Sequence, residues 1–382
     1  TTTLVYQRML APIIFALFSS YTAHNLILAI ASTTTPLLFL LPTFLRPRLV
    51  CRSPTVGNGQ QDMGTVGLAA GFDADGNLTP WCAFMGFGFH SVGTVTVNSC
   101  RGNRPLAATL GRAVRSRSLY VWKGLRNLGL SALLTRLARL PRDSTVRGVS
   151  VGPANEEACA GADAQVESVL AALRVLRDAP ADRVSYVELN ISCPNLSGEN
   201  CLQRPDVAAR LIREAHAEGL LWKGATWVKF PLLTDESAAL ALMTALVDTV
   251  PGAVTGLVVA NLYRDRVSPA LDPAEVAALP GAGKFSGAPC AEPSNALLRL
   301  ARRHFGRRIR LVGCGGIFTA ADAYQKIRLG AESVQLATAL VFNGPLAPLA
   351  IDRGLAALAA ADGFATLQDA VGVDVDEVEQ TE

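Results

Sequence analysis

The segment Tyr186-Val-Glu-Leu-Asn190-Ile-Ser-Cys193-Pro-Asn195-Leu-Ser-Gly198 changes from apolar to polar character within a few residues. Its first half, together with Val184, has the β-branched and aromatic residues typical of a buried strand. Its second half presents two amides and a thiol, which are candidate ligand groups because α/β folds bind ligands at the carboxyl ends of their strands. Taken alone, this window is equally compatible with a strand followed by an Asn/Pro turn.

The composition of the 382 residues indicates a large globular core, because half of them are hydrophobic and 18% are charged. This length fits one large α/β domain or two ordinary ones. A net charge of +3, without a basic run interleaved with aromatic residues, does not indicate nucleic-acid binding. The eight cysteines form no CxxC pair and the four histidines lie far apart, so we expect neither a metal site nor a disulfide framework. A reducing compartment is the simplest assumption.

The N-terminal segment contains no Asp, Glu, Lys or Arg between Arg8 and Arg46. Its apolar clusters are Met9–Phe18, Leu26–Ile30 and Leu37–Leu45. We expect residues 1–46 to form helices that attach the protein to a bilayer or to membrane-embedded neighbours. A chain beginning at Thr1 is also compatible with removal of a leader, as in an organelle protein.

Residues 26–45 are long enough to cross a bilayer. The Thr33-Thr-Thr-Pro36 break argues against a clean spanning helix and favours a helical hairpin that lies on the membrane. Both arrangements remain open.

After residue 56 the pattern changes to short apolar strands that alternate with helices. A Gly/Gln-rich linker at 57–64 predicts two parts, an extension over 1–56 and a barrel domain over 57–382. The candidate strands are 65–70, 89–95, 147–151, 184–190, 225–230, 255–261, 309–313 and 332–337. Helical patterns fall at 163–177, 205–219, 235–249, 293–304 and 319–329. This alternation predicts an α/β fold, the (β/α)8 TIM barrel. The long 97–146 segment is expected to carry an insertion over the barrel mouth.

The last two strands end in segments suited to a phosphate. One leads into Gly313-Cys-Gly315-Gly316, and the other into Ala337 and Thr338. In (β/α)8 barrels a phosphate commonly lies between these two loops, held by backbone N–H groups. We therefore expect a phosphate at Gly315, Gly316 and Thr338.

Lys229 ends an otherwise apolar strand. A buried lysine needs an anionic partner. A flavin ring that becomes an anion on reduction would supply one, and a structural ion pair is the alternative.

Specific motifs extend this pattern from about residue 5 to residue 375. They are Gly67-Leu-Ala-Ala-Gly-Phe-Asp73, Gly86-Phe-Gly88, Gly93-Thr-Val-Thr96, Asn190-Ile-Ser-Cys-Pro-Asn195, Val228-Lys229, Ser286-Gly287, Gly313-Cys-Gly-Gly316 and Phe342-Asn-Gly-Pro345. Together they resemble the dihydroorotate dehydrogenases, in particular the membrane-associated, quinone-linked class 2. The hydrophobic extension, with Ala23-His24 inside it, resembles the two-helix module that leads quinone to the flavin in that class.

The resemblance implies a barrel that binds FMN and serves pyrimidine biosynthesis. Dihydroorotate would give a hydride to the flavin while a base takes a proton from the neighbouring carbon, and quinone would accept the electrons. The FMN contacts would be Ala70, Gly71, Thr94, Asn190, Lys229, Gly287, Gly315, Gly316, Ala337 and Thr338. The substrate contacts would be Asn190, Asn195 and Asn261, and Cys193 stands at the position of the base. Class 2 members usually have serine there, so the chain combines a class 2 body with the cysteine of class 1A.

Several positions lack a polar group that the resemblance implies. Ala74 stands in place of a lysine beside the substrate, Val121 and Ser150 in place of asparagines, and Ala260 and Leu262 in place of threonines. Each loss of a buried hydrogen-bonding group typically costs about 1–3 kcal/mol. Two hypotheses therefore stay open. One is an FMN oxidoreductase of this family. The other is a catalytically inactive structural subunit of a membrane (respiratory) complex. Either would be expected at the mitochondrial inner membrane.

Overall fold

The structure is a computed structural model that describes residues 2–40, 64–140, 146–180 and 182–376, with side chains of the N-terminal helices described up to Thr35. The linker expected at 57–64 therefore lies outside the described residues except for Gly64.

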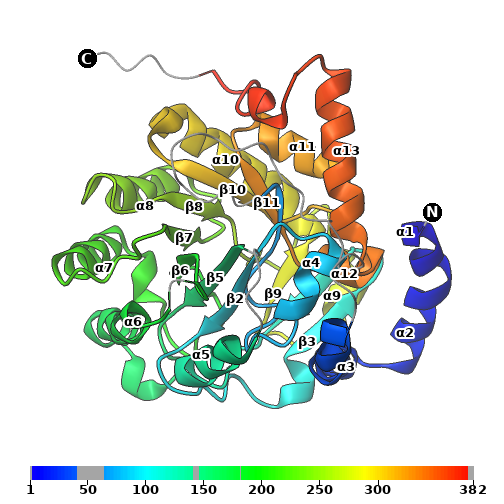
Figure 1. Cartoon of the computed structure of the whole chain (residues 1–382), viewed down its shortest axis with the longest axis horizontal. Helices are drawn as coiled ribbons and strands as arrows, with labels where there is room; N and C mark the ends of the chain where they lie inside the picture. Colours follow the sequence, from blue (N-terminus) through cyan, green and yellow to red (C-terminus); the bar gives the residue numbers. More distant parts are fainter. Residues whose placement is uncertain (1, 41–63, 141–145, 181, 377–382) are drawn as a thin grey trace.

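Eight parallel strands close into a barrel in the order β1-β11-β10-β8-β7-β6-β5-β2 (Figure 1). Their bounds are β1 Val66–Leu68, β2 Phe89–Val95, β5 Val146–Val151, β6 Tyr186–Asn190, β7 Thr226–Phe230, β8 Gly256–Val259, β10 Arg310–Cys314 and β11 Ser333–Leu336. The first and last strands of the sequence pair in parallel, with Gly67 opposite Gln335. The predicted (β/α)8 barrel is confirmed, and every strand lies within one residue of a predicted range.

Helices cover the outside of the barrel (Figure 1). They are α4 Cys82–Met85, α5 Leu130–Arg139, α6 Ala162–Arg177, α7 Pro205–Ala217, α8 Glu236–Asp248, α10 Ala291–Phe305, α11 Ala320–Arg328 and α13 Ala347–Ala361, with the short α9 Pro273–Ala277 and α12 Thr338–Asn343 beside the mouth. Helix α7 shows why these segments are helical. Pro205 begins it, and Val207, Leu211 and Ala215 recur every four residues on its buried face.

Large aromatic side chains fill the amino-terminal half of the barrel. Phe89, Tyr186 and Trp227 are buried there in one cluster. Neighbouring glycines make room for them, because a Cβ on Gly148 would lie 2.0 Å from the Tyr186 ring and one on Gly256 would lie 2.1 Å from Trp227. This end of the barrel is a packed core, so the space for a ligand lies at the carboxyl ends of the strands.

A three-stranded antiparallel sheet, which the sequence analysis does not predict, covers one side of the barrel mouth. It consists of β3 Leu110–Ala113, β4 Ser118–Val121 and β9 Lys284–Gly287. The first two strands belong to the predicted insertion at 97–146. We call this element the cap sheet.

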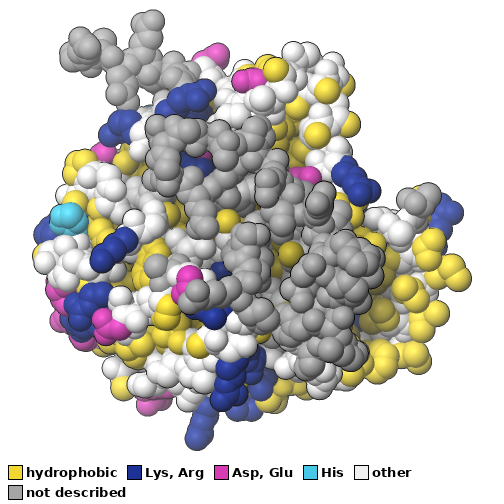
Figure 2. Space-filling view, viewed as in Figure 1, with side chains coloured by type: hydrophobic (Ala, Val, Ile, Leu, Met, Phe, Trp, Pro, Cys, Tyr) yellow, Lys and Arg dark blue, Asp and Glu magenta, His cyan; other side chains and the backbone are white. Residues whose placement is uncertain are grey.

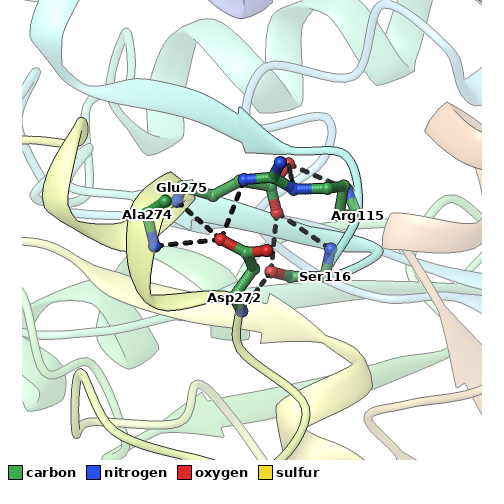
Figure 3. A network of polar contacts seen from close by, with 5 residues as sticks. All are labelled: Arg115, Ser116, Asp272, Ala274 and Glu275. Carbon is green, nitrogen blue, oxygen red and sulfur yellow. Dashed lines mark hydrogen bonds and ion pairs between the residues drawn. The ribbon is translucent and has the colours of Figure 1, made fainter.

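A polar network ties the turn between β3 and β4 to α9 (Figure 3). Glu275 accepts hydrogen bonds from the backbone N–H groups of Arg115 and Ser116, at 2.8 and 2.9 Å. Arg115 donates to Asp272 Oδ1 at 2.9 Å, and the same oxygen accepts from the N–H groups of Ala274 and Glu275 at the start of α9. The cap sheet is thereby held to the segment that follows β8.

The N-terminal extension is helical in the part that the structure describes. It consists of α1 Thr2–Val5, the π-helical turn η1 Tyr6–Leu10, α2 Ala11–Leu17 and α3 Ser20–Leu40. The chain bends by 111° between the Thr2–Leu17 and Ser20–Thr35 segments. No single described helix is long and apolar enough to cross a membrane, although this bent pair together meets the length and composition criteria.

The helix break expected at Thr33–Pro36 is wrong, because α3 continues through it. The hydroxyls of Thr34 and Thr35 donate to the carbonyls of Ile30 and Ala31 one turn earlier, at 2.6 and 2.7 Å, and so are satisfied within the helix. The break lies instead between α2 and α3, where Phe18 is extended.

Candidate active site

A cavity of about 430 Å³ lies between the carboxyl ends of the strands, the cap sheet and the N-terminal helices. This volume is within the usual range for ligand pockets. The predicted residues on its wall are Ala70, Gly71, Thr94, Asn190, Cys193, Asn195, Asn261, Ala337 and Thr338. The structure therefore brings together residues from five of the barrel strands or the loops that follow them.

Amide and hydroxyl groups on this wall and next to it form one hydrogen-bonded chain. Asn261 Nδ2 donates to Ser192 Oγ at 2.7 Å, and Ser192 donates to Asn190 Oδ1 at 2.7 Å. Asn190 Nδ2 in turn donates to Thr94 Oγ1 at 2.6 Å. Thr94 also bonds to Ser150 Oγ at 3.0 Å, so the serine at this position keeps a polar link to the cluster. The network fixes the orientation of both asparagines before any ligand binds.

Asn195 carries a free acceptor. Its Nδ2 donates to the carbonyl oxygen of Val121 in β4 at 3.1 Å, whereas its Oδ1 is buried and has no hydrogen-bond partner among the described residues. An unsatisfied buried amide oxygen is costly, and a ligand N–H would satisfy it.

Cys193 lies on the same wall and is 6% exposed. Burial raises the pKa of its thiol to about 11, although a backbone hydrogen bond at Asn195 and the charge of Arg264 act in the opposite direction. The thiol is therefore protonated at neutral pH.

Lys229 lies inside the barrel rather than on the cavity wall, with its side chain buried. Its Nζ donates to Gln335 Oε1 at 3.3 Å. The other side of the same amide, Gln335 Nε2, donates to Ser91 Oγ at 3.1 Å and lies 3.4 Å from Glu188 Oε2. The lysine therefore contacts a neutral amide. No carboxylate within 4.0 Å of it is recorded among the described residues, so the structural ion pair considered above is not found there.

The remaining predicted residues Gly287, Gly315 and Gly316 do not line the cavity. Gly287 lies against Thr338, and Gly315 and Gly316 lie against the start of α10. All three have positive φ, at +88°, +107° and +71°. A Cβ on Gly316 would lie 2.4 Å from Ala291 Cβ, and one on Gly287 would lie 2.9 Å from Thr338 Cγ2. Ser286 Oγ and Thr338 Oγ1 are hydrogen-bonded at 2.7 Å. The backbone here adopts a conformation that L side chains rarely enter.

Apolar side chains of the N-terminal helices form the other half of the wall. Ile14, Phe15 and Ile27 line the cavity together with Tyr6 and His24. His24 stacks edge-on against Phe72 at 5.1 Å between centroids, and burial lowers its pKa to about 3, so it is neutral.

The sequence analysis missed three residues that the structure brings to this site, namely Ser192, Arg112 and Lys123. Ser192 lies within the deciding segment and could have been identified from it. Arg112 and Lys123 belong to the insertion, and their positions depend on how the cap sheet folds over the mouth. Of the substituted positions, Ala74, Val121 and Leu262 line the cavity, whereas Ala260 is buried.

Similar proteins identify the family. The fold and the site place the chain among (β/α)8 barrels with a ligand site at the carboxyl ends of the strands. Residues 58–358 match the family model described as Dihydroorotate dehydrogenase. The chain belongs to the dihydroorotate dehydrogenase family.

Individual relatives agree with this assignment. A protein of Thermobifida fusca named dihydroorotate dehydrogenase (quinone) is 39% identical over 332 residues, which cover 83% of this chain and 82% of the relative. A protein of the same name from Deinococcus deserti is 32% identical over 383 residues, covering 97% of this chain and 100% of the relative. These names are those of the quinone-linked class 2.

A solved structure shows the same fold. The crystal structure of DHODH from Eimeria tenella in complex with ferulenol covers 92% of this chain and 94% of its own, with 22% identity and a TM-score of 0.74.

Proposed function

We propose that this protein oxidises dihydroorotate to orotate with FMN as cofactor and quinone as electron acceptor, a step of pyrimidine biosynthesis. The observation that carries the proposal is the cavity, which joins a cluster of amides and a thiol at the barrel mouth to an apolar passage between the N-terminal helices. The polar ring of the substrate would bind at the amide end of this cavity, and the apolar quinone would bind at the end lined by the N-terminal helices.

The residues present fit FMN. Lys229, buried against neutral Gln335, provides a cation for a ring that becomes negative on reduction. Gly71 has φ +98° and open space where a Cβ would be, so the backbone beside the cavity admits a planar ring closely. Gly287, Gly315, Gly316, Ala337 and Thr338 supply the backbone at which the phosphate would bind. When bound, FMN supplies the hydride acceptor.

The amides and the thiol fit the other part of the reaction. Oxidation of dihydroorotate removes a hydride from one carbon and a proton from its neighbour. Asn190, Asn195 and Asn261 would hold the ring, with the free Oδ1 of Asn195 accepting a ring N–H. Cys193 would take the proton as thiolate, because a neutral thiol has no free capacity for one.

The N-terminal helices would hold the quinone and the membrane surface. Large apolar side chains are exposed along α1, η1, α2 and the start of α3. They are Leu4, Val5, Met9, Leu10, Ile13, Leu17, Leu26, Ile27 and Ile30. Figure 2 shows hydrophobic side chains gathered at the edge of the molecule where α1 and α2 lie. Burial of such a patch in a bilayer interface is favourable, and this supports membrane association through residues 1–46.

The mitochondrial inner membrane remains a prediction. The second hypothesis from the sequence, an inactive subunit of a membrane complex, rests on the polar groups lost at Ala74, Val121, Ser150 and Leu262. The relatives reported above, named dihydroorotate dehydrogenase (quinone), add no support for it.

Acceptor preference tests the proposed function. Purified protein should carry bound flavin and form orotate from dihydroorotate with a short-chain ubiquinone faster than with fumarate or NAD⁺. Absence of flavin, together with failure to bind added FMN, would contradict the proposal. Turnover with NAD⁺ or fumarate at the rate seen with quinone would contradict the acceptor.

A further inference from the structure

Lys123 is a cation in the cavity with unused hydrogen-bonding capacity. Its Nζ donates to the carbonyl oxygen of Gly71 at 3.0 Å, and no other acceptor is recorded for it in the described part of the chain. An ammonium has three donors, so two remain for a ligand. Desolvation lowers the pKa of its ammonium, with the charge of Arg126 acting in the same direction and those of Asp73 and Asp75 in the opposite one.

The carboxylates near Lys123 are engaged elsewhere. Asp73 accepts from the N–H groups of Asn77 and Leu78, at 2.9 and 2.6 Å. Asp75 Oδ1 accepts from the N–H of Leu128 at 2.9 Å. No salt bridge to Lys123 within 4.0 Å is recorded over the residues that the structure describes. Its ammonium is therefore available to an anionic ligand.

Two other Arg or Lys residues line the cavity within the described residues, and both are committed to the N-terminal helices. Arg112 donates to the carbonyl oxygens of Phe15 and Phe18. Arg126 Nη1 donates to the hydroxyl of Tyr21 at 2.9 Å. Lys123, in contrast, donates its recorded hydrogen bond to the carbonyl of Gly71 and none to the described part of the N-terminal helices.

The loop that carries Lys123 is fastened to the candidate substrate loop. Asn195 Nδ2 donates to the carbonyl of Val121, two residues before Lys123, and Asn103 Nδ2 donates to the carbonyl of Asn195 at 3.0 Å. The backbone just before Lys123 is therefore tied to Asn195.

Lys123 and Ala74 both line this cavity and a second one beside the N-terminal helix α3. The resemblance places an ammonium at position 74, and this chain has a methyl group there.

We propose that Lys123 binds the carboxylate of the substrate, and thereby selects a carboxylated pyrimidine over the same ring without a carboxylate. The inference rests on the proposed function and assigns a specificity-determining residue to its site. In this chain the ammonium comes from Lys123, in the loop that follows β4 of the cap sheet, instead of from position 74 in the loop that follows β1.

A comparison of two ligands tests the assignment. The dissociation constants of orotate and of uracil, which lacks only the carboxylate, are measured by calorimetry on the FMN-loaded protein. Lys123→Met should weaken orotate about ten- to a hundred-fold, the value of one charge-assisted hydrogen bond. Uracil should change by less than about twofold, because it makes no contact with the ammonium.

Two further variants complete the test. The double variant Lys123→Met/Ala74→Lys should recover orotate affinity, because the ammonium returns from the neighbouring position. Lys223→Met, the same change at an exposed position before β7, should leave both ligands unaffected. Unchanged orotate binding in Lys123→Met, or equal weakening of orotate and uracil, would overturn the assignment. If the native protein with FMN bound does not bind orotate, the proposed function itself fails, which is a distinct result.

Discussion

The guanidinium of Arg112 lies 4.5 Å above the ring of Phe15 and donates to the backbone carbonyl of the same residue at 3.2 Å. It also donates to the carbonyl of Phe18, at the bend between α2 and α3. One side chain of the cap sheet therefore caps the end of α2, which would otherwise leave carbonyls unpaired, and holds the apolar passage against the barrel.

We predict that Arg112→Leu separates the two halves of the reaction. Loss of the charge-assisted hydrogen bonds should loosen α2 by about 2 kcal/mol and lower quinone-dependent turnover about tenfold or more. Flavin reduction by dihydroorotate should be nearly unchanged, because the amide cluster does not contact Arg112. Rapid-mixing measurement of each half-reaction checks this, with Arg303→Leu at an exposed position of α10 as control. Equal slowing of both half-reactions would refute the prediction.

Cys193→Ala should abolish flavin reduction by dihydroorotate while orotate still binds. In the native protein the thiol pKa of about 11, raised by burial, leaves little thiolate at neutral pH. The reduction rate should therefore rise about tenfold per pH unit below that pKa, because only the deprotonated form accepts the proton. Stopped-flow traces at several pH values measure this. Cys159→Ala is the control, and a pH-independent rate would exclude Cys193 as the base.

Gly316→Ala should reduce flavin content and stability together. Its φ of +71° disfavours an L side chain, and the new Cβ would lie 2.5 Å from Ala291 Cα. The expected cost is about 2–4 kcal/mol in the free energy of unfolding. Gly363→Ala, with φ +82° but open space around its Cβ, should cost only about 1 kcal/mol. Thermal unfolding and the ratio of flavin to protein check both. Full flavin loading of Gly316→Ala would argue against a phosphate site there.

The exposed stripe Met9, Ile13 and Leu17 should carry membrane binding. These side chains are 62%, 56% and 69% exposed and recur every four residues. Replacing all three with Gln should release most of the protein from sedimented lipid vesicles, since each large apolar side chain contributes up to about 1.5–3 kcal/mol when buried. Changing Leu128 and Val267, which are exposed elsewhere, to Gln should have no such effect. Identical sedimentation of the two variants would refute the assignment.

The barrel could be predicted from the sequence because each of its strands is a short apolar run bounded by turn residues. Asn190, Cys193 and Asn195 could be placed for the same reason, since a strand that ends in polar groups locates them at the barrel mouth.

The cap sheet could not be predicted, because its strands are short and its pairing joins distant segments. Ser118 of β4 pairs with Gly287 of β9, far along the chain, and Arg112 and Arg117 obscure any apolar pattern. The position of Lys123 at the cavity could not be predicted for the same reason, because its hydrogen-bond partner Gly71 follows a different strand. The bend in the extension was also misplaced, because the hydroxyls of Thr34 and Thr35 can be satisfied inside a helix as well as at its end.

The proposed function requires that dihydroorotate reduce a flavin held in this barrel. The most direct measurement is the visible flavin absorbance of the purified native protein during anaerobic mixing with dihydroorotate, followed by addition of quinone. We predict that the absorbance is lost as orotate forms, and that it returns when quinone is added. A flavin that stays oxidised in the presence of saturating dihydroorotate would contradict it.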